Sequence, residues 1–186
     1  MEIAPASSPA SPVNNIVACW NSARGATLRF LEVNRRLFER RVAEDRVRDG
    51  HGDLHAASVC MTEPIAIFEC IEFNDRFRCG DVAAEVAFLA MDLEYNDRPD
   101  LGAAFVDQYV ASSGDRELRQ LLDFYVCYPA CIRGKVESFK LAEAEFSPAE
   151  RAEAQRRARR YFHLARASAD RFSNRRPVLT ALPLAA

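Results

Sequence analysis

Two acidic residues in the stretch 51–73 have the types and spacing needed for phosphoryl transfer. Asp53 lies in a turn of small residues, and Glu69 directly follows the second of two short apolar runs. This layout predicts a catalytic loop leading into a β-hairpin, whose returning strand brings Glu69 within metal-bridging reach of Asp53. In kinases one acid aligns and deprotonates the attacking hydroxyl, while another holds the Mg²⁺ that bridges the phosphates. A further Mg²⁺ ligand follows the loop acid by five positions, where this sequence has Ser58.

The loop resembles that of a known family. The residues His51-Gly52-Asp53-Leu54-His55 resemble the catalytic loop of the aminoglycoside phosphotransferase family, small-molecule kinases with the protein-kinase fold. Further motifs follow in the family's order and are similar to a branch in which the kinase-like domain is fused to a C-terminal P-loop ATPase domain. They lie at residues 68–74, 80–83, 87–93 and 133–136, and the resemblance covers residues 28–180.

The resemblance implies a fold, a reaction and a set of site residues. It implies a mainly α fold with a small β-hairpin, which is the C-terminal lobe of a kinase-like structure. Asp53 would be the catalytic base, His51 would brace the loop, and Ser58 and Glu69 would hold Mg²⁺. ATP would be the phosphate donor, and a small molecule with a hydroxyl group would be the acceptor. The acids Glu72 and Asp92 are best interpreted as solvent-facing; the alternative is that they border the acceptor cleft, where they would attract a cationic substrate.

Three positions depart from the family pattern and support a second interpretation. Glu69 stands where the family has Asp, Ser58 stands where this branch commonly has Asn or His, and Pro129 stands where the family usually has Arg. Together with the missing phosphate-clamping lysine described next, these departures favour the alternative of a non-catalytic, pseudokinase-like helical interaction module.

The parts of a kinase that bind ATP are not found in this sequence. Kinases clamp the ATP phosphates with a lysine on an N-terminal strand beneath a glycine-rich loop. Here Lys135 and Lys140 are the only lysines, both follow the catalytic loop, and no G-x-G-x-x-G motif occurs. Residues 176–180 resemble the first strand of the P-loop domain, but no G-x-x-x-x-G-K-[ST] motif follows. We therefore expect the N-terminal lobe and the P-loop ATPase domain to be missing partners of this lobe, and the chain alone to be inactive.

Composition favours an ordinary globular domain. The formal net charge is −2 and 49% of the residues are hydrophobic, which argues against a strongly basic nucleic-acid binder. No apolar run approaches the roughly 20 residues of a membrane span. The six cysteines form no C-x-x-C motif, which predicts reduced thiols and a cytoplasmic location. A zinc site is a weaker alternative, because its histidines already belong to the loop motif; it would use His51, His55, Cys60 and Cys70.

Periodicity and capping signals divide the chain into segments. Residues 1–15 are predicted to be a disordered tail, 16–146 the kinase-like lobe, 147–172 a basic helix docking on that lobe and leading to the P-loop domain, and 173–186 a second tail. Within the lobe we expect one amphipathic helix ending near residue 45, a buried helix over 82–93, and helices over 101–112 and 116–144. The first should present the apolar residues Leu28, Leu31, Phe38 and Val42 on one face.

Capping residues mark where three of these helices begin. Asp81 is predicted to cap the helix over 82–93, and in the resembled fold an acid here also ties back to the catalytic loop. Asp115 is the expected cap before the helix over 116–144, and Ser147 with Glu150 forms a capping box.

The last helix carries many arginines. The favoured interpretation is a solvated face; contact with a phosphate or an acidic partner is the alternative, and nucleic-acid binding is the weakest because no aromatic stacking platform accompanies the arginines. They are Arg151, Arg156, Arg157, Arg159, Arg160, Arg166 and Arg171.

Overall fold

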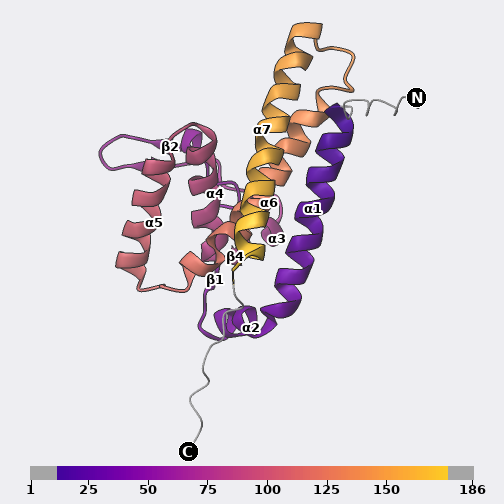
Figure 1. The fold of residues 1–186 in the computed structure, drawn as a ribbon. Helices are drawn as coiled ribbons and strands as arrows, with labels where there is room; N and C mark the ends of the chain where they lie inside the picture. The colour runs from indigo at the N-terminus through magenta and orange to yellow at the C-terminus, as the bar shows by residue number, and fades with distance from the viewer. Residues whose placement is uncertain (1–11, 176–186) are drawn as a thin grey trace, which may run out of the picture.

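The computed structural model describes residues 12–175, and in them the chain is mainly helical with small antiparallel sheets (Figure 1). The predicted mainly α fold with a small hairpin is confirmed at this level. In chain order the elements are α1 (Pro12–Val33), α2 (Arg35–Ala43), β1 (Val47–Asp49), the 3₁₀ turn η1 (Ala56–Ser58), β2 (Val59–Cys60), β3 (Ala66–Ile67), α3 (Asp75–Arg78), β4 (Cys79–Asp81), α4 (Val82–Tyr95), α5 (Pro99–Ser113), α6 (Leu118–Phe139) and α7 (Pro148–Ser173).

The long helices α1, α6 and α7 pack side by side (Figure 1). Small residues make this close approach possible: Ala23 of α1 and Ala165 of α7 are almost completely buried. Gly134 of α6 is needed for the same reason, because a Cβ at that position would lie 3.0 Å from the ring of Phe162. Where α1 ends, aromatic rings fill the core instead, with Phe30 stacked on Phe124 at a centroid distance of 4.8 Å.

A second part of the core holds α4 and α5 against the start of α6. Val86 of α4, Val106 of α5 and Leu121 of α6 are buried there. Because α4 contacts both α5 and α6, it is buried on most sides, as the apolar composition of residues 82–93 predicts.

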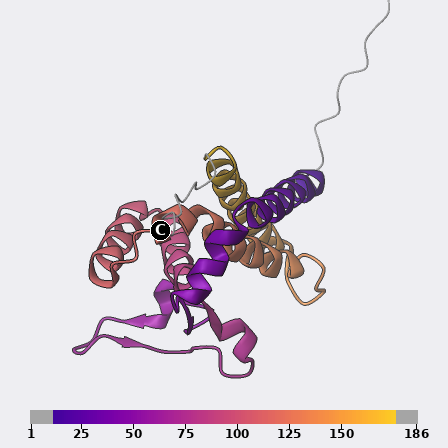
Figure 2. The same cartoon turned by 90° about the horizontal axis from the view of Figure 1, so that it is seen from below.

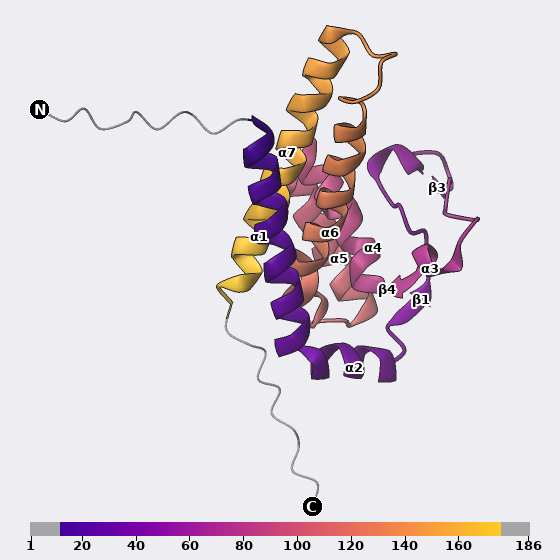
Figure 3. The same cartoon turned by 90° about the vertical axis from the view of Figure 1, so that its right-hand side faces the viewer.

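The first predicted helix is in fact two helices, and this corrects the expected apolar face. The chain breaks at Asn34, whose side-chain amide donates to the carbonyl of Phe30 at 2.9 Å, and α2 then lies across the foot of α1 (Figure 3). The change of direction turns Leu37 into the core, while Leu28 is 55% and Val42 is 63% exposed. Only Phe38 of the predicted face packs against the core.

Several predicted boundaries shift by a few residues. Helix α1 begins at Pro12, so residues 12–15 are helical rather than part of the expected tail. Proline suits the first turn of a helix because its missing N–H would have no partner there. Helix α6 ends at Phe139, short of the expected residue 144, and contains Pro129 as predicted. Residues 1–11 and 176–186, which include most of both predicted tails, lie outside the described residues.

The caps at Asp81 and Ser147 are confirmed, whereas α6 begins at Leu118 with Glu117 as its N-cap, so Asp115 contacts the helix start without being its cap residue. Asp81 accepts from the N–H of Ala83 at 2.9 Å, and Asp115 accepts from the N–H of Leu118 at 3.2 Å. Ser147 and the Glu150 side chain form the reciprocal capping box at the start of α7.

The strands lie in the segment that connects α2 to α4, which extends away from the helices (Figure 2). Strand β1 pairs antiparallel with β4, with Arg48 opposite Gly80. Strand β2 pairs antiparallel with β3, with Val59 opposite Ile67, so the predicted hairpin is present. The two short sheets bracket residues 50–58 and thereby position the candidate catalytic loop.

Helix α7 is an integral part of the bundle, and its arginines are mostly used within the molecule. Tyr161, Phe162 and Ala165 are among the buried residues of this helix. Arg157 pairs with Glu137 at 2.9 Å, and Arg160 pairs with Asp97 at 2.5 Å. Such pairs leave less free positive charge for an external phosphate than the sequence alone indicates.

Among the described helices, none is both long enough and apolar enough to span a lipid bilayer.

Candidate functional site

A cleft of about 690 Å³ opens beside Asp53. Helices α1, α4 and α6 and the segment 76–81 form its walls, and most of the lining side chains are apolar or aromatic. A concave, largely apolar cavity of this size with a few convergent polar groups is typical of a small-molecule site. The charged side chains that line it are Asp53, Arg76, Arg78, Asp81, Glu85 and Arg133.

Asp53 is held by cationic and potentially cationic neighbours. Its Oδ1 accepts a hydrogen bond from Nη2 of Arg133 at 2.9 Å, and its Oδ2 lies 3.8 Å from Nε2 of His55. The Arg133 guanidinium also lies over the ring of Phe88, 5.6 Å from its centroid. The carboxylate is 41% exposed, so a molecule in the cleft can reach it.

Two acids of α4 hold the backbone of the loop. Oε1 of Glu85 accepts from the N–H of Gly52 at 2.7 Å, and Oδ2 of Asp92 accepts from the N–H of Ala56 at 2.9 Å. The expected tie between α4 and the loop therefore exists, but Glu85 makes it rather than Asp81. Asp92, a candidate for bordering the acceptor cleft, instead bonds to the loop backbone and does not line the cleft.

His51 fastens the loop to the returning chain. Its Nε2 lies 2.8 Å from the carbonyl oxygen of Phe68, and its Nδ1 accepts from the N–H of Asp53 at 3.3 Å. Because a carbonyl oxygen can only accept, Nε2 must carry the proton. The N–H of Ile71 also donates to the carbonyl of His51 at 2.9 Å. With both ring nitrogens engaged, His51 has the contacts of a brace, as the resemblance implies.

Asp81 belongs to a buried ionic network beneath the cleft. Arg41 of α2 is 1% exposed and pairs with Asp81 at 2.5 Å and with Asp115 at 2.7 Å. Tyr125 donates to Asp81 at 3.2 Å. Burial raises the pKa of Tyr125, and the negative charge of Asp81 raises that pKa further. The network links α2, the start of α4 and α6. It therefore holds in place the helices that lie next to the loop.

The two predicted metal ligands lie outside this cleft. Ser58 is fully buried and its hydroxyl contacts the His55 ring at 3.3 Å, while the Glu69 side chain is exposed. Glu69 has φ +61°, and neither residue is among those lining the cleft with Asp53. The hairpin does bring the two segments side by side, through the contact between His51 and Phe68.

The arrangement of metal-binding side chains bears on one of the predicted metal sites. Across the part of the chain that the structure describes, no three or more His, Cys, Asp or Glu side chains are arranged to hold a metal ion. This finding bears on the weaker zinc alternative, which would use His51, His55, Cys60 and Cys70. Binding of Mg²⁺ by Ser58 and Glu69 stays a prediction, as does the use of ATP that the resemblance implies.

Sequence reasoning missed the partners that surround Asp53. Glu85 gave no local signal, because it lies inside an apolar helix and binds a residue 33 positions away. Arg133 lies in one of the family-like motifs at 133–136, which was the available clue. Its pairing with Asp53 spans 80 positions and depends on how α6 packs.

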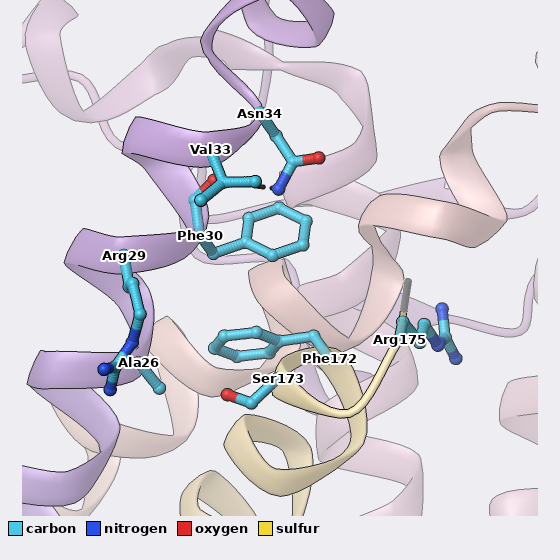
Figure 4. A pocket seen from close by; sticks show the side chains of 8 residues that line it. All are labelled: Ala26, Arg29, Phe30, Val33, Asn34, Phe172, Ser173 and Arg175. Atoms are coloured by element: carbon cyan, nitrogen blue, oxygen red, sulfur yellow. Dashed lines mark hydrogen bonds between the residues drawn. The ribbon is translucent and has the colours of Figure 1, made fainter. Parts of the chain in front are cut away.

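A smaller cavity of about 190 Å³ lies between the ends of α1 and α7 (Figure 4). Phe30 and Phe172 face it from the two helices, and Arg175 lies at its other side (Figure 4). Arg175 already pairs with Asp123 at 2.5 Å, and no acid or histidine lines the cavity. This cavity offers no set of groups for chemistry, so the cleft beside Asp53 is the better candidate.

Curated relatives match part of the chain. The uncharacterized protein Rv2004c of Mycobacterium tuberculosis (strain H37Rv) is 41% identical over 111 residues, which are 59% of this chain and 22% of that protein. The uncharacterized protein Mb2027c of Mycobacterium bovis matches with the same identity and the same coverage. The matched segment is thus about a fifth of the length of these relatives. No family model matches the chain, and no solved structure matches it.

Proposed function

We propose that this chain is the C-terminal lobe of an aminoglycoside phosphotransferase-like small-molecule kinase, with Asp53 as the residue that aligns the hydroxyl of the acceptor. The observation that carries the proposal is the position of Asp53: it lies on a braced loop and lines the largest described cavity. A catalytic base must lie within hydrogen-bond reach of the proton it takes, and an accessible carboxylate at the edge of a cleft meets this condition.

The surrounding residues have distinct roles in this proposal. The acceptor hydroxyl would donate its hydrogen bond to Oδ2 of Asp53, because Oδ1 is bound to Arg133. His51 and Glu85 would hold the loop so that the carboxylate stays aligned. ATP with Mg²⁺ supplies the transferred phosphoryl group in such kinases, and no step here is assigned to the metal.

The second candidate is a pseudokinase-like module that works through an interface. Its support is that Asp53 is paired with Arg133, while Glu69 is exposed and does not line the cleft. In this alternative the loop is a structural remnant, and the apolar cleft is the functional surface.

The chain alone is expected to form no ADP from Mg²⁺-ATP above background, because no phosphate-clamping lysine lies before the catalytic loop. A coupled ADP assay with a panel of hydroxyl-bearing small molecules measures this. Turnover by the purified chain that disappears in Asp53→Asn would contradict the prediction.

A chimera tests the proposal itself. The 111 residues of this chain that match Rv2004c replace their counterparts in that protein, and ADP formation is compared among the chimera, Rv2004c and an Asp53→Asn chimera. Where Rv2004c forms ADP, we expect the chimera to form it as well, with a loss of about 10²-fold or more in the Asp53→Asn chimera, because a general base contributes at least that much.

The matched control is Asp100→Asn, an exposed acid on α5 that pairs with Arg98 and should leave the rate unchanged. An active Rv2004c with an inactive, folded chimera would favour the pseudokinase alternative. Activity that survives in Asp53→Asn would overturn the assignment of Asp53.

A further inference from the structure

We propose that the cleft beside Asp53 binds a small organic anion, a carboxylate or phosphate carried on an aromatic or aliphatic body. The inference rests on the proposed function in one respect: this anion would also carry the hydroxyl that accepts the phosphoryl group. It departs from the expectation of a cationic acceptor, which the acids Glu72 and Asp92 had suggested.

The acids that line the cleft already accept hydrogen bonds from other groups of the protein. Asp81 accepts from Arg41, Tyr125 and the N–H of Ala83. Glu85 accepts from the loop backbone, and Asp53 is paired with Arg133.

Asp92 bonds to the N–H of Ala56, and Glu72 does not line the cleft. Among the acids that line the cleft, only Asp53 and Glu85 keep a side-chain oxygen without a described hydrogen bond, and Oδ2 of Asp53 is the one assigned to the acceptor hydroxyl.

Two of the three arginines that line the cleft, in contrast, have N–H donors without a described partner. Arg133 uses Nη2 on Asp53, and within the described residues its Nε and Nη1 have no hydrogen-bond partner. Arg76 is exposed and forms no ion pair in the part of the chain described by the structure. Arg78 is already bound to Asp49 and Asp75. Guanidinium groups have only N–H donors and match carboxylate or phosphate oxygens well.

The rest of the cleft suits an apolar body. Phe77 is 57% exposed and Tyr128 is 62% exposed, although both line the cleft. Val136 is 45% exposed beside them. Large apolar side chains left uncovered around a cavity mark a surface that gains from burial by a ligand. Because the cavity holds about 690 Å³, a ligand of one or two rings or a medium-length chain fits.

Three probes with one apolar body separate the charge from the hydrophobic contribution. They are 2-naphthylacetate, 2-(2-naphthyl)ethanol and 2-(2-naphthyl)ethylammonium, each titrated into the purified chain by isothermal calorimetry. We expect the carboxylate to bind at least about tenfold more tightly than the ammonium, with the alcohol between them, because a charge-assisted hydrogen bond supplies that difference.

Two arginine variants test where the probe binds. Arg76→Gln and Arg133→Gln should each weaken carboxylate binding by about five- to tenfold and leave alcohol binding within about twofold. The matched control is Arg36→Gln, because Arg36 is also exposed but lies on α2 and does not line the cleft. Arg76→Gln removes an exposed side chain without an ion pair among the described residues, so its folding should be unaffected even if Arg133→Gln is destabilised.

Each outcome decides the inference. Carboxylate preference that is lost in Arg76→Gln and kept in Arg36→Gln supports it. Absence of binding by all three probes, equal or tighter binding of the ammonium, or carboxylate binding that both cleft variants retain would overturn it. The kinase proposal is judged separately by ADP formation in the chimera, so a failed titration and an inactive chimera are distinguishable results.

Discussion

Replacement of Arg41 by methionine is expected to lower the free energy of unfolding by about 3–5 kcal/mol, because it leaves two buried carboxylates without a positive partner. Arg41 is 1% exposed, and the side chains of Asp81 and Asp115 are 6% and 2% exposed. Its guanidinium makes four hydrogen bonds to these carboxylates, at 2.5–3.0 Å. Methionine has similar length and no polar atom to replace them.

Urea unfolding followed by circular dichroism measures this loss, and the neighbouring Arg40 provides the control. Arg40 pairs with Glu117, and both side chains are more than a quarter exposed, at 29% and 27%. Arg40→Met should therefore cost about 1 kcal/mol or less. The triple variant Arg41→Met, Asp81→Asn, Asp115→Asn should recover part of the loss, because it removes the unpaired charges. Equal costs for Arg40→Met and Arg41→Met would contradict the prediction.

The same ion pair predicts how stability depends on pH. Burial by itself would raise the pKa of Asp115, but the hydrogen bond and positive charge of Arg41 outweigh burial and hold that pKa below its ordinary value. A carboxyl group with a lowered pKa stabilises the folded state above its unfolded-state pKa of about 4, and this contribution is lost as the pH falls through the folded value. The wild-type protein should thus lose stability below about pH 4 more steeply than Arg41→Met.

The second large effect is expected from Gly52→Ala, which should lower the free energy of unfolding by about 2–4 kcal/mol. Gly52 has φ +83°, in the left-handed region that glycine adopts without strain. A Cβ there would lie 2.7 Å from the carbonyl oxygen of Phe77 and 3.0 Å from Cδ1 of Ile71, so the backbone would have to move. In an active chimera, a shift of about 1 Å at Asp53 would reduce the rate about 10²-fold.

Two other glycines separate the causes of this effect. Gly114 has φ +68°, but a Cβ added there would meet no atom within 4 Å, so Gly114→Ala should cost only the strain of about 1–2 kcal/mol. Gly80 has neither a positive φ nor a close neighbour, so Gly80→Ala should be nearly neutral. Thermal unfolding of the three variants measures the loss of stability, which should be largest for Gly52→Ala, smaller for Gly114→Ala and smallest for Gly80→Ala. A cost for Gly52→Ala no larger than that for Gly114→Ala would show that the close contacts do not matter.

Much of the fold could be predicted because its signals are local. The capping box of Ser147 and Glu150, the cap at Asp81 and the turn before the hairpin each involve residues only a few positions apart. The break at Asn34 was not predicted, because both halves of the segment have helical periodicity. Which apolar residues of that segment face the core depends on the direction of α2, and this direction is set by packing.

The loop that carries Asp53 and His51 could be predicted from the sequence, but the positions of the other site residues around it could not. The small-residue turn identified Asp53 and His51 as a loop, and the structure has Asp53 at the edge of a cleft with His51 bonded to the loop and to Phe68. The sequence placed Ser58 and Glu69 at metal-ligand spacing, yet one side chain is buried against His55 and the other is exposed. Spacing along a chain does not determine the side to which a side chain points once the backbone adopts a turn with positive φ.

The sequence by itself determined a mainly helical chain, the helix caps and the one acidic loop that could do chemistry, because each depends on neighbours along the chain. Only the tertiary structure decided that Arg133 pairs with Asp53 across 80 positions and that Arg41 joins Asp81 to Asp115 across 40 and 74 positions. It also decided that Arg76 and Arg133 keep free donors in the cleft, whereas Arg78 is paired and the acids that line the cleft already accept hydrogen bonds. These pairings require helices distant in sequence to pack together, and no local pattern records which charged residues then meet.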